Sequence, residues 1–274
     1  MSIILQNLAS PTIEEAIEAN FNEEFAHLSK GRPEGELHKT SELTWMFTGS
    51  HGPNAVLYSR FASNDVTYIN AKINEMIMFY RTRNVDFGWS TGPSTLPTDL
   101  EQRLETHGFA YVDRTMGMAI NMQDLNKHVF VNKDLVITEV NDLDRLQILR
   151  SIEISGFGAS ETEAQNYYDA HANTGFGDKT PWHHYIGWLH GEPVAIASLL
   201  LHAGVAGIYG VTTIPQYRRQ GIAATMTLHA LQEACKLGYR ISILSSSKMS
   251  DALYRRIGFR DFCTIMHYGW SAGL

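Results

Sequence analysis

The sequence predicts an α/β (α+β) fold built from two tandem halves, and three observations lead to this prediction. Short apolar runs typical of strands alternate along the chain with segments in which apolar residues recur at helical spacing. The polar stretch "QDLNKHVFVNKD" separates two such series, so we place the domains at residues 1–128 and 129–274. The two series also end alike, because "VDFGWS", "LEQRLETHGF" and "TMGMAINM" repeat the order of "ISILSSS", "DALYRRIGF" and "TIMHYGW". Such a repeat indicates a duplication.

The first half is expected to begin with a helix and then to alternate strands and helices. Pro11 and the early acids of "TIEEAIEANFNEEF" are typical of a helix start. Strands are predicted at "ELTWMFTG", "NAVLYSRF", "NVDFGWS" and "TMGMAINM". A box formed by Thr98 and Glu101 predicts a short helix at "TDLEQRLETHGF". The longest helix is predicted at "NDVTYINAKINEMIMFYRTR", where one face carries Ile69, Ile73, Met76, Ile77 and Tyr80.

The second half continues in the same manner. Its first strand is "LVITEV", followed by helices at "NDLDRLQILRSIEISGF" and "SETEAQNYYDAHANTGF". "HHYIGWLHGEPVAIASLLLHAG" reads as a hairpin turning at Gly191-Glu192, and "AGIYGVTT" as the next strand. "YRISILSSS", "SDALYRRIGF" and "CTIMHYGW" then read as strand, short helix and final strand. The helix "GIAATMTLHALQEACKLG", ended by a glycine, should point inward with Ala224, Leu228, Leu231 and Cys235.

Composition and charge narrow the functional classes. The chain is 44% hydrophobic and 19% charged, which is typical of a globular protein. Residues 207–274 carry eight Lys/Arg against three Asp/Glu, a net charge of +5. Because the whole chain has a net charge of −7, residues 1–206 carry −12. This suits a small anionic ligand at one end and disfavours nucleic acid, which most of the surface would repel. No apolar run reaches the roughly 20 residues of a membrane span. Two cysteines and the lack of a signal-like start favour a cytoplasmic protein.

The stretch "VTTIPQYRRQGIAATM" has the parts of a phosphate cradle. A strand that stops and enters a helix presents amides without intrahelical partners, and the helix dipole favours an anion there. Pro215 ends the strand, Gly221 permits close approach, and Ala223 and Ala224 keep the first turn free of bulk. Neither the G-x-x-x-x-G-K-[ST] loop nor the G-x-G-x-x-G fingerprint is present.

The loop instead carries the pattern Arg218-x-x-Gly221-x-Ala223 between a strand and a helix. This pattern resembles the acetyl-CoA signature of the GNAT superfamily of N-acetyltransferases. The following strand, the serines and "ALYRRIGF" resemble the next blocks of that superfamily in the same order, over residues 135–270. The resemblance implies a mixed, mostly antiparallel sheet flanked by helices, in a tandem form whose first half is degenerate. Many members have glycine where this chain has Arg219, so that side chain must point outward.

The resemblance implies acetyl-CoA as co-substrate and no metal. It implies that the strand ending in Thr213 parts from "YRISIL", that the pantetheine arm lies between them, and that the amide of Val211 supports the thioester oxyanion. The pyrophosphate would lie on the amides from Arg219 to Ala224. The implied cofactor-binding residues are Val211, Thr212, Thr213, Arg218, Arg219, Gln220, Gly221, Ile222, Ala223, Ala224, Ser247 and Tyr254.

Tyr254 is the expected catalytic residue. Its place matches the tyrosine of the superfamily, and a phenol with a pKa of about 10 can protonate a leaving thiolate whose conjugate acid titrates near 8.5. The alternative is a core tyrosine that packs the last helix. The general base stays open: the position at which some relatives carry glutamate is Gly207, which leaves a water relay or one of Tyr209, His202, His183 and His184.

The acceptor would lie over the first two helices of the second half and against the first half. Phe157 and Tyr167 could form its apolar walls, and Glu153 or Glu161 could hold a cation. We therefore expect an N-acetyltransferase that acts on a small amine by direct attack in a ternary complex. A protein lysine or N-terminal acetyltransferase and a non-catalytic acyl-CoA-binding module are the alternatives. We expect no nucleic-acid or membrane partner, and a monomer or homodimer.

The first half should have lost the cofactor site. Aligning Gly108-Phe109 on Gly258-Phe259 puts Leu104 where Tyr254 stands. The helix "NDVTYINAKINEM" follows "SRFAS", which lacks the R-x-x-G-x-A pattern. This half should bind no CoA; it should pack on the catalytic half and shape the acceptor pocket.

Overall fold

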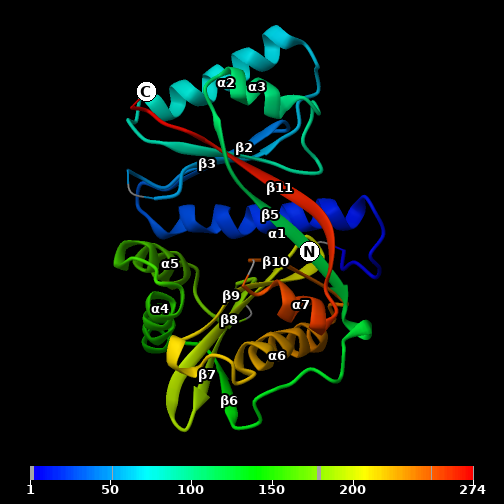
Figure 1. The fold of residues 1–274 in the computed structure, drawn as a ribbon. Coiled ribbons are helices and arrows are strands. Elements are labelled where there is room, and N and C mark those ends of the chain that lie inside the picture. Colours follow the sequence, from blue (N-terminus) through cyan, green and yellow to red (C-terminus); the bar gives the residue numbers. More distant parts are fainter. Residues whose placement is uncertain (1–2, 51, 178–179, 248, 274) are drawn as a thin grey trace.

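The computed structural model describes residues 3–50, 52–177, 180–247 and 249–273. Within these residues the chain folds around one sheet of eleven strands in the order β1-β2-β3-β4-β11-β5-β10-β9-β8-β7-β6 (Figure 1). The strands are β1 (Glu36–Lys39), β2 (Leu43–Phe47), β3 (Ala55–Ser59), β4 (Phe87–Thr91), β5 (Ala110–Asn121), β6 (Leu135–Glu139), β7 (Trp182–Leu189), β8 (Glu192–His202), β9 (Val205–Thr213), β10 (Ile241–Ser246) and β11 (Arg260–Trp270). The helices are α1 (Thr12–Leu28), α2 (Val66–Arg81), α3 (Leu100–Thr106), α4 (Leu143–Phe157), α5 (Glu161–Thr174), α6 (Ile222–Lys236) and α7 (Asp251–Ile257).

The two halves exchange their last strands. β5, the last strand of the first half, pairs with β10 of the second half, and β11, the last strand of the chain, pairs with β4 of the first half. β5 and β11 also pair with each other from Arg260↔Ala119 to Gly269↔Ala110, so a two-stranded ribbon joins the halves (Figure 1). We expected a separate sheet for each half, but the structure has one continuous sheet. The strand before the expected boundary at residue 128, β5, pairs with β10 of the second half.

Pairing in this sheet is mostly antiparallel, as expected. Two neighbouring pairs are parallel, β3–β4 in the first half and β9–β10 in the second half. These pairs occupy equivalent places, because each joins the strand before a long helix (α2 or α6) to the strand after it. This equivalence agrees with the repeat in the sequence.

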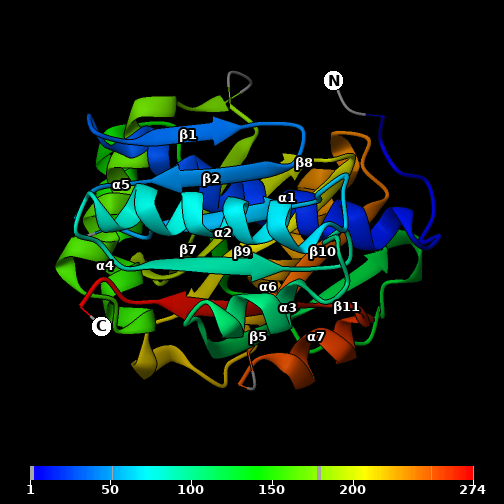
Figure 2. The same ribbon diagram turned by 90° about the horizontal axis from the view of Figure 1, so that it is seen from above.

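Helix α1 lies between the two halves (Figures 1 and 2). It contacts β3 of the first half, β8 and β9 of the second half, and both strands of the connecting ribbon. Its buried apolar side chains explain this position, because Ile13, Ile17 and Phe21 join a core cluster with Trp182, Leu200, Tyr209 and other residues of the second half. The first helix of the chain is therefore part of the packing of the second half.

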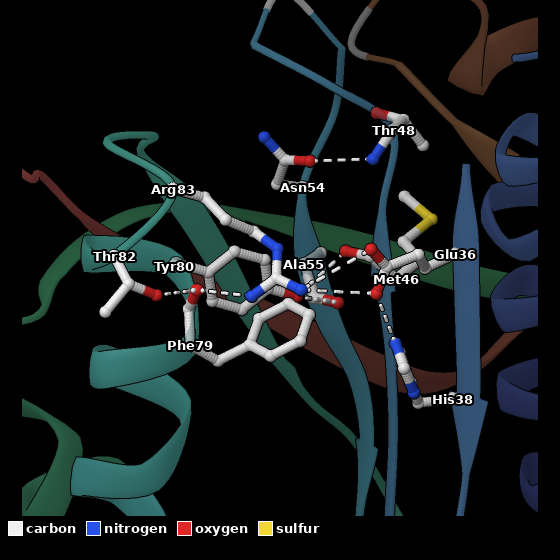
Figure 3. Close-up of polar contacts among 10 residues, drawn as sticks. All are labelled: Glu36, His38, Met46, Thr48, Asn54, Ala55, Phe79, Tyr80, Thr82 and Arg83. Atoms are coloured by element: carbon white, nitrogen blue, oxygen red, sulfur yellow. Dashed lines mark hydrogen bonds and ion pairs between the residues drawn. The ribbon is translucent and has the colours of Figure 1, made fainter. Parts of the chain in front are cut away.

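The first half has its own core beneath α2. The five apolar residues predicted on one face of that helix are all buried. The hydroxyl of Tyr80 donates hydrogen bonds to the carbonyl oxygens of Met46 (2.8 Å) and Ala55 (3.0 Å), which ties the helix to β2 and β3 (Figure 3). At the surface beside them, Arg83 lies 3.7 Å from the centre of the Phe79 ring and 3.4 Å from the Glu36 carboxylate.

Several local predictions were wrong. The Thr98–Glu101 box does not form: α3 follows Asp99 without a side-chain cap, and the Glu101 carboxylate accepts a hydrogen bond from Thr91 instead (2.7 Å). The hairpin turns at residues 190–191, and β1 was not predicted because "ELHK" is short and polar.

On α6, Ala224 and Leu231 are buried as predicted, whereas Leu228 is half-buried and Cys235 is exposed. The small side chains of Ala230 and Ala234 are buried instead, because they let the helix lie close to β8 and β9.

Candidate active site

The strands β9 and β10 separate within the sheet, as predicted. Their parallel pairing runs only from Ser242↔Ala206 to Leu244↔Ile208. Beyond Ile208, β9 stays paired with β8 as far as Thr213, while β10 stays paired with β5 as far as Ser246. The backbone from Tyr209 to Thr213 therefore has no strand partner on the side of β10 within the described residues. This opening is the place where an extended ligand can bind main-chain groups.

A bulge redirects β9 at this opening. The register with β8 shifts between Ile196 and Ser198, and Gly210 adopts a φ of +57° that favours glycine. Val211, the expected oxyanion donor, lies directly after this glycine. The hydroxyl of Thr213, at the end of β9, is buried and has no hydrogen-bond partner among the described residues, so a ligand there could satisfy it.

The loop before α6 is shaped as the sequence predicted. Gly221 is the N-cap residue of the helix and has a φ of +75°, and Arg219 also lies in the left-handed region at +64°. A Cβ atom on Gly221 would lie 2.9 Å from the ring of Phe130, so both conformation and space require glycine. Within the described residues, no backbone acceptor takes a hydrogen bond from the amides of residues 219–224. These unpartnered amides lie at a helix N-terminus, which is a favourable place for an anion.

The two arginines of this loop behave differently. Arg219 is exposed, which agrees with the expected outward side chain. The guanidinium of Arg218 donates to the carbonyl oxygens of Thr213 (3.0 Å) and Gly156 (2.7 Å), so it ties the end of β9 to the end of α4. The side chain of Arg218 therefore positions the loop rather than facing a ligand.

The segment before β6 also holds this loop. Asn132 donates from its side chain to the Gln220 carbonyl oxygen (3.2 Å) and from its amide to the Thr225 hydroxyl (2.9 Å). Together with Phe130, it packs the polar connection between the halves against the start of α6. The sequence reasoning missed this support because a polar connecting stretch carries no periodic signal.

Ser247 and Tyr254 lie on the other side of the opening. Ser247 is exposed at the end of β10, where its carbonyl oxygen accepts from the amides of Ser250 and Asp251 at the start of α7. Tyr254 is buried in the core of the second half, with its ring 6.1 Å from that of Phe259. Burial raises the pKa of Tyr254 to about 12 despite a lowering hydrogen bond to Ser250. The phenol is therefore protonated at neutral pH and able to donate.

The structure removes two of the candidates for the general base. The Tyr209 hydroxyl donates to the side-chain oxygen of Asn20 on α1 (2.7 Å), and burial raises its pKa well above the usual value. His184 is buried, and burial lowers its pKa to about 3. The position of Gly207 has no room for a carboxylate, because a Cβ atom there would lie 2.3 Å from the Asn20 side-chain oxygen. His183 pairs with Glu139 of the edge strand β6 (2.8 Å).

A buried polar cluster covers the α1 side of β8 and β9. His171 Nδ1 lies 3.1 Å from His27 Nε2 and 3.0 Å from His184 Nε2, and His184 Nδ1 lies 2.8 Å from the Ser198 hydroxyl. The Tyr167 hydroxyl donates to Ser198 at 3.5 Å. Burial lowers the pKa of His27 to about 4 and that of His171 well below its usual value, so these imidazoles are neutral. His27 comes from the first half, and no pattern in the sequence indicates its position in this cluster.

The expected acceptor residues separate into two groups. Glu153 and Tyr167 point into the molecule, where Glu153 is 8% exposed and burial raises its pKa to about 8. Phe157 is exposed, and Glu161 is an exposed side chain that pairs with Arg150 on the surface. Only the first pair is placed to meet a ligand in the interior.

The equivalent opening in the first half is filled by the chain itself. β3 and β4 pair only at Ala55↔Gly88 and Val56↔Trp89, and Leu96 then lies beside β3. The amide of Leu96 donates to the Ser59 carbonyl oxygen (3.3 Å), and its own carbonyl oxygen accepts from the Phe61 amide (3.1 Å).

At the start of α2, the carboxylate of Asp65 accepts the hydrogen bond of the Tyr68 amide (2.8 Å). A negative charge therefore occupies the helix N-terminus at which a phosphate would bind.

Two further properties concern the described part of the chain only. No helix there is long and apolar enough to cross a bilayer. No three His, Cys, Asp or Glu side chains there are arranged so that they could hold a metal ion.

Comparison with known proteins finds a similarity over the part of the chain that holds this site. Residues 146–259 match the model of the acetyltransferase (GNAT) family. No curated protein shows significant sequence similarity to the chain.

Among solved structures, a GCN5-related N-acetyltransferase from Kribbella flavida is similar with a TM-score of 0.67 at 19% identity, over 90% of this chain and 94% of the other. A tandem GNAT protein from the clavulanic acid biosynthesis pathway is similar with a TM-score of 0.66 at 10% identity, over 97% of this chain and 98% of the other. The predicted resemblance to the GNAT superfamily and the predicted α/β (α+β) fold are thereby confirmed.

Proposed function

We propose that this chain, an acyltransferase whose second half carries a GNAT-family domain, transfers the acetyl group of acetyl-CoA to the amine of a small molecule. The observation that carries the proposal is the pairing of two features: the opening between β9 and β10, and the unpartnered amides of residues 219–224 at its end. The first can hold the extended pantetheine arm, and the second can hold the pyrophosphate.

The residues of the opening fit this ligand. The main chain of Val211 and Thr213 faces the side from which β10 has departed, so it is available to the amides of the arm. The unpartnered Thr213 hydroxyl offers a further polar group at the end of the same strand. The first turn of α6 consists of the uncharged residues Ile222, Ala223 and Ala224. No side-chain charge there competes with a diphosphate for the loop amides and for the positive end of the helix dipole.

The proposed chemistry is direct attack in a ternary complex. The lone pair of the amine forms the N–C bond at the thioester carbonyl, whose oxygen develops negative charge near the Val211 amide. The C–S bond then breaks, and the phenol of Tyr254 gives its proton to the departing sulfur. Burial keeps Tyr254 protonated until that moment, because its pKa is raised to about 12.

A small acceptor fits the architecture better than a protein chain. The face of β8 and β9 opposite α6 is covered by α1, α4 and α5, with apolar and polar contacts across all three helices. A lysine on a folded protein would have to pass this cover, whereas a small amine could enter between the helices. The net charge of −12 before residue 207 favours the approach of a cation.

The first half is proposed to bind no cofactor. Leu96 occupies the opening between its parallel strands, and the Asp65 carboxylate occupies its helix N-terminus. We assign to it the role of completing the sheet and of placing α1 on the catalytic half.

Two measurements test the proposal. Calorimetry with acetyl-CoA should show binding at one site per chain, and a panel of small amines tested with a thiol-reporting dye should include acceptors that release free CoA. Binding without thiol release from small amines or peptides would favour the non-catalytic module. Release with peptides alone would favour the protein acetyltransferase, and absence of binding would overturn the proposal.

A further inference from the structure

Helix α1 presents a polar face to the second half at three successive positions. Asn20, Glu24 and His27 lie at the i, i+4 and i+7 spacing that places side chains on one face of a helix. The first contacts Tyr209 of β9 at 2.7 Å, and the last contacts His171 of α5 at 3.1 Å. The middle position, Glu24, therefore faces the space between β9 and α5. Its charge acts on both Tyr209 and Tyr167, which agrees with this placement.

The carboxylate of Glu24 has no stabilising partner in the folded protein. Within the described residues it makes no hydrogen bond and no ion pair, and burial raises its pKa to about 8. The next carboxylate along the helix, Glu23, behaves differently, since it pairs with Lys30 (3.3 Å) and Lys39 (3.8 Å) at the surface. A half-buried acid with no partner costs stability unless a ligand compensates for it.

A second unpartnered carboxylate approaches the same space from α4. Glu153 is 8% exposed, has no partner in the described part of the chain, and acts on Tyr167 as Glu24 does. Two buried donors nearby are also unsatisfied there, His171 Nε2 and Trp182 Nε1, whose rings lie 5.0 Å apart. Polar groups from four elements therefore lack protein partners in one region, which indicates that a ligand binds there.

This region lies on the acceptor side of the opening. Tyr209 precedes Val211 by two residues on β9, which is roughly 7 Å along a strand. The usual place for a carboxylate on β9 is filled, because Gly207 is covered by Asn20 of α1. The same helix supplies Glu24 one turn further on.

We propose that Glu24, contributed by the degenerate half, is the general base of the acetyl transfer, and that Glu153 holds the acceptor as a primary ammonium ion beside Tyr167. This inference rests on the proposed function. The ammonium gives one proton to the Glu24 carboxylate, and the free amine attacks the thioester. Glu24 releases that proton to solvent and then accepts the second proton as the nitrogen becomes an amide. Tyr254 gives its proton to sulfur and takes back the proton that Glu24 releases through solvent, so that one proton in all is lost to solvent.

The surrounding groups leave this role to Glu24. His27 on the same helix, His171 on α5 and His184 on β7 are neutral imidazoles of low basicity. Tyr167 and Tyr209 stay protonated because burial raises the pKa of each well above its usual value. A carboxyl group that titrates near the working pH is better suited to accept a proton than any of these.

The variants Glu24→Gln and Glu23→Gln test the proposal as a matched pair on one helix. Glu24→Gln should lower kcat for the best amine about a hundredfold, keep the acetyl-CoA Kd within about threefold, and abolish the rise of kcat with pH toward about 8. Glu23→Gln should keep the wild-type kcat and pH profile. Glu153→Gln should raise the KM for the amine more than it lowers kcat. A Glu24→Gln enzyme with wild-type kcat and pH profile would overturn the inference.

A binding measurement separates this inference from the proposed function. n-Butylammonium chloride, compared with n-butanol of the same shape, should raise the Tm of the wild type and of Glu23→Gln but not that of Glu153→Gln. An equal shift in all three proteins, or none in the wild type, would contradict the ammonium site whether or not acetyl-CoA binds. Loss of acetyl-CoA binding in the wild type would instead remove the proposed function.

Discussion

At the residue scale, Tyr254 carries most of the proposed chemistry on the thiol side. It lies in the core against Phe259, so its ring is fixed by packing, while its hydroxyl forms a hydrogen bond with Ser250. Its pKa, raised to about 12 by burial, makes it a weaker acid than a free phenol but keeps the proton in place at neutral pH. The side chain is thus both a structural and a chemical element, and the two roles can be separated by mutation.

Tyr254→Phe is expected to lower kcat about a hundredfold, because the departing thiolate loses its proton donor. The acetyl-CoA Kd should change by less than about threefold, since the ring keeps its place in the core. Steady-state kinetics and calorimetry check both values. The control is Tyr239→Phe, at a half-buried tyrosine beyond α6, which should match the wild type. Equal kcat in the two variants would remove Tyr254 from the mechanism.

At the element scale, the turn from β9 into α6 decides whether the diphosphate can bind. Thr213, Pro215 and Gly221 follow one another closely in the sequence, so local chemistry alone shapes this loop. The positive φ values of Arg219 and Gly221 turn successive amides toward one point. Arg218 then fixes the loop to α4 through two carbonyl oxygens.

Gly221→Val is expected to weaken acetyl-CoA binding at least tenfold. A branched side chain disfavours the φ of +75° and would collide with Phe130, at a cost of about 1–3 kcal/mol. Calorimetry gives the Kd. Gly238→Val is the matched control at the other end of the same helix, where φ is +88° but no atom lies within 4 Å of the added Cβ. Similar Kd values in both variants would show that the loop is not the diphosphate site.

At the scale of the whole molecule, the exchange of β5 and β11 makes the two halves one folding unit. The outer part of β11 completes the sheet of the first half, and β5 separates β10 from β11 in the second. Neither half can form its full sheet without the other, although all expected cofactor residues lie between 211 and 254.

A chain that ends at Phe259 should therefore lose cooperative unfolding and acetyl-CoA binding, even though the deletion removes none of the expected site residues. The deleted strand leaves β4 and β5 with unpaired edges within a sheet that is otherwise buried. Denaturant unfolding followed by circular dichroism, with calorimetry, tests this. A chain shortened only to Ser271 should behave as the full chain. Native-like binding by the shorter form would show that the second half folds alone.

The buried histidines that link α1 to α5 and β7 should make stability depend on pH. The unfolded chain binds protons at about pH 6.5, whereas the folded pKa of His27 is about 4 and that of His184 about 3. Stability is therefore present above pH 6.5 and is lost as the pH falls toward 4. Glu24 and Glu153 act oppositely, because their raised pKa values of about 8 lower stability as the pH rises from about 4.5 to 8.

Replacing His27 by Gln isolates one of these contributions. Between pH 4.5 and 6 the variant should lose less stability on acidification than the wild type, by up to about 1.4 kcal/mol per pH unit for one proton. Urea unfolding at several pH values gives the slopes. Identical slopes would mean that His27 is not kept neutral by the fold.

The sequence by itself determined the elements and the cofactor side of the site. Periodic apolar spacing located α2, and Pro11 with the early acids located α1. The contiguous stretch from Val211 to Ala224 predicted the loop that the structure contains. Such features are local, because a helix face or a strand-to-helix turn depends on residues a few positions apart.

Only the tertiary structure decided the strand exchange and the acceptor side. The pairing of Ala110 with Gly269, and the contact of Asn20 with Tyr209, join residues that are more than 150 positions apart. Glu24 gives no signal in the sequence, where it is one acid among several on an amphipathic helix. Its surroundings exist only because the sheet closes around α1, and that packing depends on the whole chain at once.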